Sequence, residues 1–238
     1  MRLLVDGDIV AYRTAAAAEQ AINWGDGHWT LHAFEEDVTS AIDGFMEKLK
    51  EQSGATEVVT ALSGTSNFRK EVADTYKLNR VDKRKPMALP TAREYLMNEY
   101  GGVIVPNIEA DDTLGIMGSA DKDSVIWSED KDLKTVPAKH LTDEGIVEIG
   151  EEEANYWFLY QTLVGDSTDN YKGCPTIGDK KARAILDKDC SWKAVVAAFE
   201  KQGLSEMVAL EQARLARILR DGEYDFETNE VRLWKPED

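Results

Sequence analysis

The chain has 238 residues, of which 42% are hydrophobic, and a formal net charge of −17. This length suits one large globular domain, alone or with a smaller appendage, and the strong negative charge argues against a protein that coats nucleic acid by bulk attraction. No apolar run reaches membrane-spanning length, so we expect a cytoplasmic protein with no membrane partner. Cys174 and Cys190 lie sixteen residues apart and are expected to be free thiols.

The first part of the chain alternates strands and helices. RLLVD (2–6) reads as a strand, and after a helical pattern the segment 22–34 reads as a hairpin turning at Gly25-Asp26-Gly27. Residues 35–52 keep helical spacing of their apolar residues, and TEVVTAL (56–62) reads as a second strand. The order strand, helix, strand predicts a parallel sheet.

The alternation continues to Pro137 and then stops. A polar segment (63–90) precedes four further elements: a helix starting at TAREYL, a strand at 103–105, a helix from Glu109 to about Met117 and a strand at 123–127. The sequence after Pro137 contains helical patterns at 151–165 and in three further stretches to about Arg220. We therefore predict an α/β core with a mainly parallel central sheet flanked by helices, followed by a helical carboxyl-terminal region.

Basic residues gather in one part of this acidic chain. From Arg69 to Lys85 there are seven basic and three acidic residues, a net charge of +4. A basic run of this kind is usually a solvated loop, but it also offers a local contact for an anionic partner.

Acidic residues follow three predicted strands. Asp130 and Asp132 come after the strand 123–127, and the other members are Asp6, Glu109, Asp111 and Asp112. Because functional groups gather at the carboxyl ends of parallel strands, these charges are expected to meet there and to need hard cations. Mg²⁺ or Mn²⁺ suits such an oxygen shell. An acidic helix amino terminus alone is more often a favourable helix-dipole arrangement than a set of metal ligands, and a solvated turn could carry Asp130 and Asp132. Three such motifs at three successive strand ends favour a metal site.

A loop rich in Gly, Pro and Asp, LVGDSTDNYKGCPTIGDKKARAIL (163–186), connects two predicted helices. Backbone amides near Gly178, where the second helix starts, would suit a phosphate. The simpler interpretation is a helical corner capped by glycine. Asp166 and Asp169 could also point back toward the other carboxylates.

Six motifs in this order resemble the structure-specific 5′ nucleases, a family that includes flap endonucleases, the 5′-nuclease domains of bacterial DNA polymerases and bacteriophage 5′→3′ exonucleases. The resemblance covers roughly residues 1–190, and the compact chain looks most like a phage exonuclease. The motifs are Val5-Asp6-Gly7, NFR (67–69), YKLNR (76–80), EADD (109–112), SEDKDL (128–133) and GDSTDNYKGCPTIGDKKA (165–182).

The resemblance implies a PIN-like 5′-nuclease core over residues 1–150 with a short basic arch at about 68–95. It implies a helical DNA-binding region over 151–238 that contains a helix-three-turn-helix at about 160–187. A phage-encoded protein of this kind would act in the host cytoplasm. Its protein partners are not implied.

The resemblance also implies two Mg²⁺ ions, with Mn²⁺ able to substitute, and a K⁺ ion at the helix-three-turn-helix. The residues implied for the first metal are Asp6, Glu109 and Asp111. The residues implied for the second are Asp130, Asp132, Asp166 and Asp169, with Asp112 nearby. Two such ions activate water and stabilise the leaving oxygen in phosphodiester hydrolysis.

Lys77 and Arg80 are implied as catalytic cations at the base of a helical arch, where they would hold the scissile phosphate. Tyr76 would stack on an unpaired base. The implied DNA contacts also include Arg69, Lys83, Arg84, Lys85, Lys172, Gly178, Lys180 and Lys181.

Two positions depart from the family pattern. Ser63 and Thr65 stand where a further aspartate usually follows the second strand, so we expect weaker or more hydrated binding of one metal. Thr176 stands where the loop usually has glycine, so we expect an altered loop.

The implied function is 5′→3′ exonuclease or flap endonuclease activity on duplex or branched DNA with 5′ ends, extending to RNA in RNA–DNA hybrids. The alternatives are a PIN-like endoribonuclease and a non-catalytic module that binds branched DNA.

Overall fold

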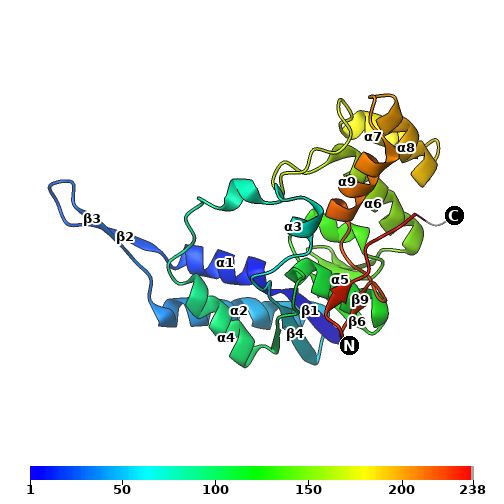
Figure 1. The fold of residues 1–238 in the computed structure, drawn as a ribbon. Coiled ribbons are helices and arrows are strands. Elements are labelled where there is room, and N and C mark those ends of the chain that lie inside the picture. Colours follow the sequence, from blue (N-terminus) through cyan, green and yellow to red (C-terminus); the bar gives the residue numbers. More distant parts are fainter. Residues whose placement is uncertain (237–238) are drawn as a thin grey trace.

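The computed structural model describes residues 1–236, and a six-stranded sheet forms its centre (Figure 1). The strand order is β5-β4-β1-β6-β7-β8, and only the β7–β8 pair is antiparallel within this sheet. The strands are β1 (Arg2–Asp6), β4 (Glu57–Ala61), β5 (Gly102–Val103), β6 (Ser124–Trp127), β7 (Lys139–Thr142) and β8 (Gly145–Glu148). The predicted mainly parallel sheet is confirmed.

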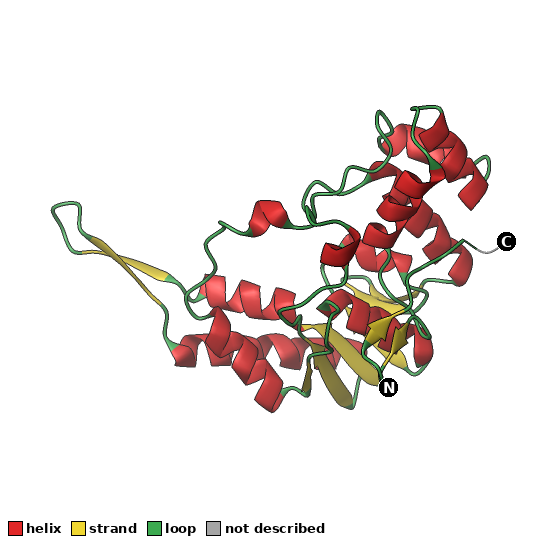
Figure 2. Ribbon diagram, in the orientation of Figure 1, coloured by secondary structure: helices red, strands yellow, loops and turns green. Residues whose placement is uncertain are grey.

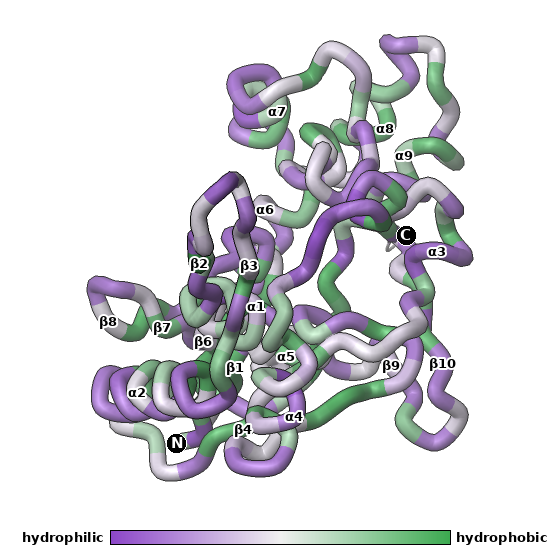
Figure 3. The backbone as a smooth tube through the Cα atoms, turned by 90° about the vertical axis from the view of Figure 1, so that its left-hand side faces the viewer, coloured by the Kyte–Doolittle hydropathy of each residue, from purple (hydrophilic) through white to green (hydrophobic). Residues whose placement is uncertain are grey.

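Helices cover both faces of the sheet because its central strand is apolar on both sides. Leu3 and Val5 of β1 pack on one face with α1 (Gly7–Ala17), α2 (Glu35–Ser53) and α4 (Leu89–Glu99), whereas Leu4 packs on the other face with α5 (Ala110–Ala120). This alternation follows from the two-residue period of a strand. Figure 3 shows β1 as hydrophobic, while α2 alternates between hydrophilic and hydrophobic residues, as expected for a helix with one buried side.

Two strands follow Pro137, where the sequence predicts no further strand. β7 and β8 are four residues each and form a hairpin at the edge of the sheet. Short edge strands carry a weak hydrophobic pattern, and half of their side chains face solvent. The predicted hairpin at 22–34 is present as β2 (Gln20–Asn23) and β3 (Trp29–His32), which projects away from the body (Figure 1).

The carboxyl-terminal part is helical, as predicted, and has its own apolar core. Its helices are α6 (Glu151–Val164), α7 (Asp179–Leu186), α8 (Trp192–Glu200) and α9 (Glu206–Ala216). The chain then returns to the α/β part, where Ile218 packs with Leu114 of α5, and ends with the short strands β9 (Tyr224–Asp225) and β10 (Glu230–Val231). Cys174 and Cys190 are free thiols. Within residues 1–236, no helix is long and apolar enough to cross a bilayer.

The basic segment, defined here as residues 69–85, crosses above α1 and is mostly irregular (Figure 2). It contains only α3 (Arg69–Val72) and one 3₁₀ turn, η1 (Leu78–Arg80). The helical arch implied by the resemblance is therefore largely a loop in this chain. Closely spaced positive charges repel one another along a helix, which disfavours a longer helix here.

Candidate active site

Two adjoining cavities lie where the parallel strands end. The larger has a volume of about 580 Å³ and the smaller about 60 Å³, and both are lined by Lys77, Arg80, Asp111 and Asp130. The larger cavity also receives Asp6, Asp8, Glu109, Lys85 and Arg93, and the smaller receives Asp132 and Asp169. The carboxylates predicted from three strand ends thus meet in one place.

Asp6 occupies the junction between β1 and α1. Its carboxylate accepts hydrogen bonds from the backbone N–H of Ile9 (3.2 Å) and the hydroxyl of Ser128 (2.8 Å), and the side chain is only 5% exposed. Burial raises the pKa of Asp6 to about 6, although these hydrogen bonds favour the charged form. Among residues 1–236, Asp6 therefore has no positive partner to offset its burial.

Glu109 and Asp111 come from the start of α5. Burial alone would raise the pKa of Glu109, but Lys77 and Arg69 lower it below its usual range. The pKa of Asp111 is raised well above its usual range, first by burial and then by the negative charges of Asp112 and Glu109. The positive charges of Lys77 and Arg69 therefore outweigh burial at Glu109 but not at Asp111.

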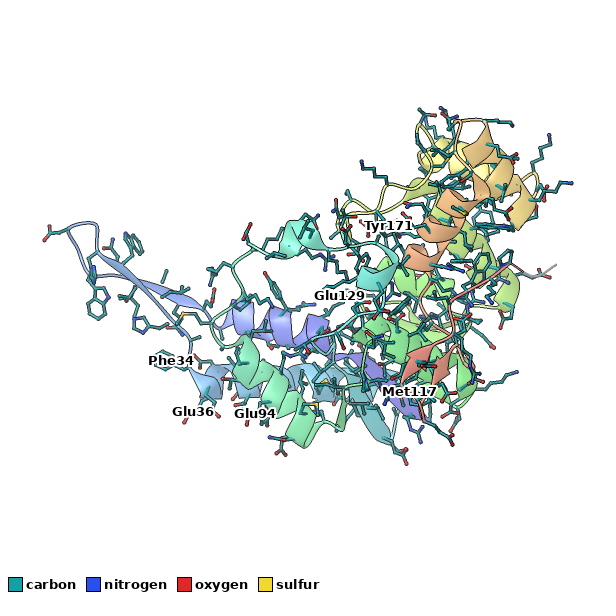
Figure 4. The ribbon with its side chains drawn as sticks, in the orientation of Figure 1. Phe34, Glu36, Glu94, Met117, Glu129 and Tyr171 are labelled. Atoms are coloured by element: carbon teal, nitrogen blue, oxygen red, sulfur yellow. The ribbon has the colours of Figure 1, made fainter. Side chains whose placement is uncertain are left out.

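Asp130 and Asp132 follow β6, and Asp130 caps the turn η2 (Lys131–Thr135) by accepting the Asp132 N–H at 2.9 Å. The pKa of Asp132 is raised to about 7, first by burial and then by Asp130 and Asp166. Asp166 does not line either cavity, and its carboxylate accepts the N–H of Thr168 at 2.6 Å. In Figure 4, Glu129, the residue before Asp130, lies near the middle of the molecule. Tyr171, whose backbone pairs with that of Asp166, lies above it.

Lys77 and Arg80 bring positive charge to these carboxylates. The Nζ atom of Lys77 lies 2.6 Å from Oε1 of Glu109 and 3.5 Å from Oδ2 of Asp169, and Arg80 is ion-paired with Asp169. The backbone of Lys77 has φ = 54°, which a residue with a side chain rarely adopts, and its N–H donates to the Asp169 carbonyl at 2.9 Å. This constrained backbone directs Lys77 into the site.

The donor set fits divalent metal ions. It consists of carboxylate oxygens, which hard cations prefer. Burial raises the pKa of Asp6, Asp111 and Asp132, and the positive charges near Asp111 and Asp132 are too weak to cancel that effect. The ammonium group of Lys77 bridges Glu109 and Asp169, as a cation would. Within residues 1–236, however, no three Asp, Glu, His or Cys side chains come close enough to enclose one ion.

Asp112 does not belong to the metal site, and Arg69 is not a surface residue. Arg69 is 2% exposed, and its guanidinium binds both oxygens of the fully buried Asp112 at 2.7 Å. Those oxygens also accept the N–H groups of Glu109 and Leu219 at 3.1 Å. The implied metal role of Asp112 and the implied DNA contact of Arg69 are both corrected, because each side chain is fully engaged in the interior.

Tyr76 is also buried, at 3% exposure, and its hydroxyl lies between Glu109 (2.9 Å) and Asp169 (2.8 Å). Its ring therefore has no free face on which a base could stack, and that predicted role is wrong. Tyr12 of α1 is 52% exposed and lines the larger cavity. The sequence indicates this position of Tyr12 indirectly. Asp8 and Tyr12 are four residues apart, so both lie on one side of α1.

The sequence interpretation also omitted Asp8 and Arg93. Arg93 of α4 is ion-paired with Asp8, and both side chains line the larger cavity. The N–H of Ser63 donates to Asp8 at 3.0 Å, and the Ser63 hydroxyl accepts the N–H of Ala110 at 2.9 Å. Ser63, which stands where the family usually has an aspartate, thus ties β4 to the start of α5 and to Asp8.

The remaining predicted DNA contacts are exposed. On the basic segment these are Lys83, Arg84 and Lys85, and in the carboxyl-terminal part they are Lys172, Gly178, Lys180 and Lys181. Arg84 is ion-paired with Glu19, and only Lys85 of the exposed set lines the larger cavity. Nothing in the geometry tests their contact with DNA or the K⁺ site, so both stay predictions.

The loop between α6 and α7 contains the predicted departure at Thr176. Thr176 has φ = 64°, a conformation that strains a β-branched residue. Its carbonyl accepts the Nζ of Lys181 at 2.8 Å. This strained turn therefore holds one of the two lysines at the start of α7.

Residues 1–154 match the family described as "5′-3′ exonuclease, N-terminal resolvase-like domain". The chain is 29% identical over 280 aligned positions to the exodeoxyribonuclease of Enterobacteria phage T3, covering 98% of this chain and 92% of that protein. It is equally similar to the exonuclease of Escherichia phage T7, at 29% identity with 98% and 93% coverage.

A solved structure supports the fold. The T5 D15 protein co-crystallised with metal ions matches with a TM-score of 0.66 at 16% identity, covering 90% of this chain and 88% of that one. At this identity the likeness concerns the fold alone, and it agrees with the mainly parallel sheet flanked by helices.

Proposed function

The chain belongs to the 5′-3′ exonuclease family, and on that premise we propose that the two cavities form a metal-dependent active site for cutting DNA near 5′ ends. The activity is that of a 5′→3′ exonuclease or flap endonuclease. A structure of the T5 D15 flap endonuclease with DNA and metal ions has the same fold. The observation that carries the proposal is the meeting of five carboxylates from three strand ends, Asp6, Glu109, Asp111, Asp130 and Asp132, with Lys77 and Arg80.

Divalent cations, Mg²⁺ by preference for oxygen ligands, would be held by two groups of residues. Asp6, Glu109 and Asp111 form the first group. Asp130, Asp132 and Asp169, with Asp166 behind them, form the second. When bound, such ions activate water and offset charge on the leaving oxygen. The raised pKa values of Asp6, Asp111 and Asp132 support this assignment, because each marks a carboxylate whose burial is only partly offset.

Lys77 and Arg80 hold the scissile phosphate in this proposal. Both side chains line both cavities, and Lys77 is held by a constrained backbone, so little reorganisation is needed when charge develops on the phosphate. Tyr12 takes the stacking role first given to Tyr76, because its ring is exposed at the cavity wall.

The loop before α7 and the lysines at its start grip duplex DNA away from the cut. Lys172, Lys180 and Lys181 are exposed there, and Gly178 precedes the helix with open space around its Cα. Contacts of this kind go to phosphates and position the duplex without reading its sequence. A negatively charged protein would thereby confine its DNA contact to this loop and the basic segment.

The test is cleavage of end-labelled substrates with and without Mg²⁺. Duplex DNA, a 5′-flap duplex, an RNA–DNA hybrid and single-stranded RNA are compared, with Mn²⁺ and K⁺ as added arms. Metal-dependent release from the 5′ end or at the flap junction supports the proposal. Cleavage of single-stranded RNA alone would favour an endoribonuclease, and flap binding without cleavage would favour a non-catalytic module.

A further inference from the structure

We propose that Arg93 binds the phosphate on the 5′ side of the scissile bond and that Asp8 and Ser63 hold Arg93 ready for it. This inference rests on the proposed function, because it concerns the DNA strand that the larger cavity receives. It adds a substrate contact that comes from α4 and not from the basic segment.

Arg93 is fixed at two points. Its NH1 group donates to the carboxylate of Asp8, and its NH2 group donates to the carbonyl oxygen of Ser63. Asp8 is itself held by the N–H of Ser63 at 3.0 Å. A guanidinium held in this way has already lost most of its rotational freedom, so a ligand that binds it encounters a pre-arranged group.

The guanidinium keeps donors for a ligand. It has five N–H groups, and among residues 1–236 its hydrogen bonds to Asp8 and Ser63 engage only NH1 and NH2. The side chain is 29% exposed and lines the larger cavity. The remaining N–H groups can therefore meet a phosphate with the two-pronged geometry that arginine favours.

The negative charge of the larger cavity favours an additional contact between a cation and the DNA. Five carboxylates line it: Asp6, Asp8, Glu109, Asp111 and Asp130. A DNA strand entering it meets strong repulsion unless cations face more than one of its phosphates. Lys77, Arg80 and Lys85 extend from the basic segment, whereas Arg93 extends from α4 and is joined to α1 through Asp8.

The position of α4 indicates on which side of the cut the DNA strand meets Arg93. Arg80 is hydrogen-bonded to Thr168 in the loop before α7, at 3.0 Å, so its end of the cavity faces the proposed duplex grip. Figure 1 shows α4 and α7 on opposite sides of the molecule. A strand running from the grip past Lys77 and Arg80 reaches Arg93 beyond the cut, on its 5′ side.

The test combines protein variants with a neutral linkage in the DNA. Single-turnover cleavage of a 5′-flap duplex is measured for the parent and for Arg93→Ala, with all linkages natural or with one methylphosphonate. Three modified substrates each carry a single methylphosphonate. It replaces the first linkage on the 5′ side of the cut, the second linkage on the 5′ side, or the first linkage on the 3′ side. We expect Arg93→Ala to slow cleavage of the natural substrate by roughly tenfold to a hundredfold, the usual effect of a lost hydrogen bond to a charged group.

On a substrate with a neutral linkage on the 5′ side, the parent and Arg93→Ala should differ by less than about twofold, because the contact is already absent. A loss that is equal on all substrates would show that Arg93 only supports the fold, and would overturn the inference. Coupling confined to the 3′ linkage would overturn it as well. If Arg93→Ala unfolds, Arg93→Lys, which keeps the charge but not the two-pronged geometry, is put through the same comparison.

Arg2→Ala is the matched control. Arg2 is also ion-paired with carboxylates, Glu57 and Asp121, but lies at the opposite end of β1. It should leave cleavage of every substrate unchanged. A parent that cuts none of the substrates contradicts the proposed function itself, whereas an active parent without coupling contradicts only the role of Arg93.

Discussion

Arg69 and Asp112 form a two-pronged ion pair in the interior, with both contacts at 2.7 Å and with 2% and 0% of their side chains exposed. Arg69 also donates to the carbonyl oxygens of Leu215 (3.1 Å) and Arg217. The pair therefore joins the start of the basic segment, α5 and the segment after α9. It fixes the frame from which Lys77 and Glu109 reach the site.

Replacing Arg69 with Met should destabilise the protein by about 3–5 kcal/mol, because Asp112 would be left buried without its partner. Unfolding by urea, followed by circular dichroism, measures this loss. Arg232→Met is the control, since Arg232 pairs with Asp225 at the surface and its side chain is 64% exposed. An Arg69→Met protein with a parental unfolding midpoint would contradict the structural role.

Lys77→Ala should slow cleavage much more than it weakens duplex binding. Lys77 lies at the carboxylates, whereas the duplex grip is assigned to the loop before α7. Losing one contact that strengthens in the transition state costs about 3 kcal/mol, or roughly a hundredfold in rate. Single-turnover cleavage and binding without metal are measured together, and near-parental cleavage would remove Lys77 from the mechanism.

The sequence predicted which carboxylates gather at the strand ends, because the signals for their positions are local. A short apolar strand with an acidic residue at its end or shortly after it identifies both the strand and the end of the sheet to which the carboxylate belongs. Asp6 and Asp130 follow this rule, and both line the larger cavity. Because the strands are parallel, their carboxyl ends lie on the same side of the sheet, so these carboxylates come together without any further signal in the sequence.

Side-chain direction was harder to predict. Asp111 and Asp112 are adjacent in α5, so they point about 100° apart and cannot both face the cavity. Asp112 is the third helical residue and accepts the N–H of Glu109, a capping arrangement that directs it inward. Arg93 could not be connected to Asp8 from the sequence, because 85 residues separate them and only the packing of α4 on α1 brings them together.

Thr176→Gly should stabilise the protein by about 0.5–1 kcal/mol. It removes the strain of a β-branched residue at φ = 64°, which outweighs the larger chain entropy that glycine gives the unfolded state. Thermal unfolding measures the change. Thr168→Gly, in the same loop but without a positive φ, should instead lower stability, and equal effects of the two substitutions would argue against strain at Thr176.

Lys180→Ala combined with Lys181→Ala should weaken binding to all duplex sequences about equally. Because each phosphate contact releases a counterion, the slope of log affinity against log salt should fall by about 2. Lys48→Ala with Lys50→Ala removes the same charge from the exposed side of α2 and should change little. A loss that depends on DNA sequence would point to base contacts instead.

Asp130→Asn with Asp132→Asn should abolish Mg²⁺ binding at the second group of carboxylates and reduce cleavage severely, because two ligand charges are lost. The fold should survive, since Asn at position 130 can still cap η2. Asp121→Asn with Asp123→Asn is the matched control. That pair has the same spacing and the same 2.9 Å bond from the second N–H to the first carboxylate, but precedes β6.

The pH dependence of stability distinguishes a crowded site from a solvated turn. The pKa of Asp132 is about 7 in the folded protein against 3.8 as the ordinary value, so the folded state binds its proton more tightly. Without metal, the stabilisation from that proton is therefore lost as pH rises from about 4 through 7. The double variant should lose this part of the pH dependence and be at least as stable as the parent at pH 8. Thermal unfolding across this range, with and without Mg²⁺, measures both effects, and a variant that keeps the parental pH profile and cleavage rate would exclude Asp130 and Asp132 from the metal site.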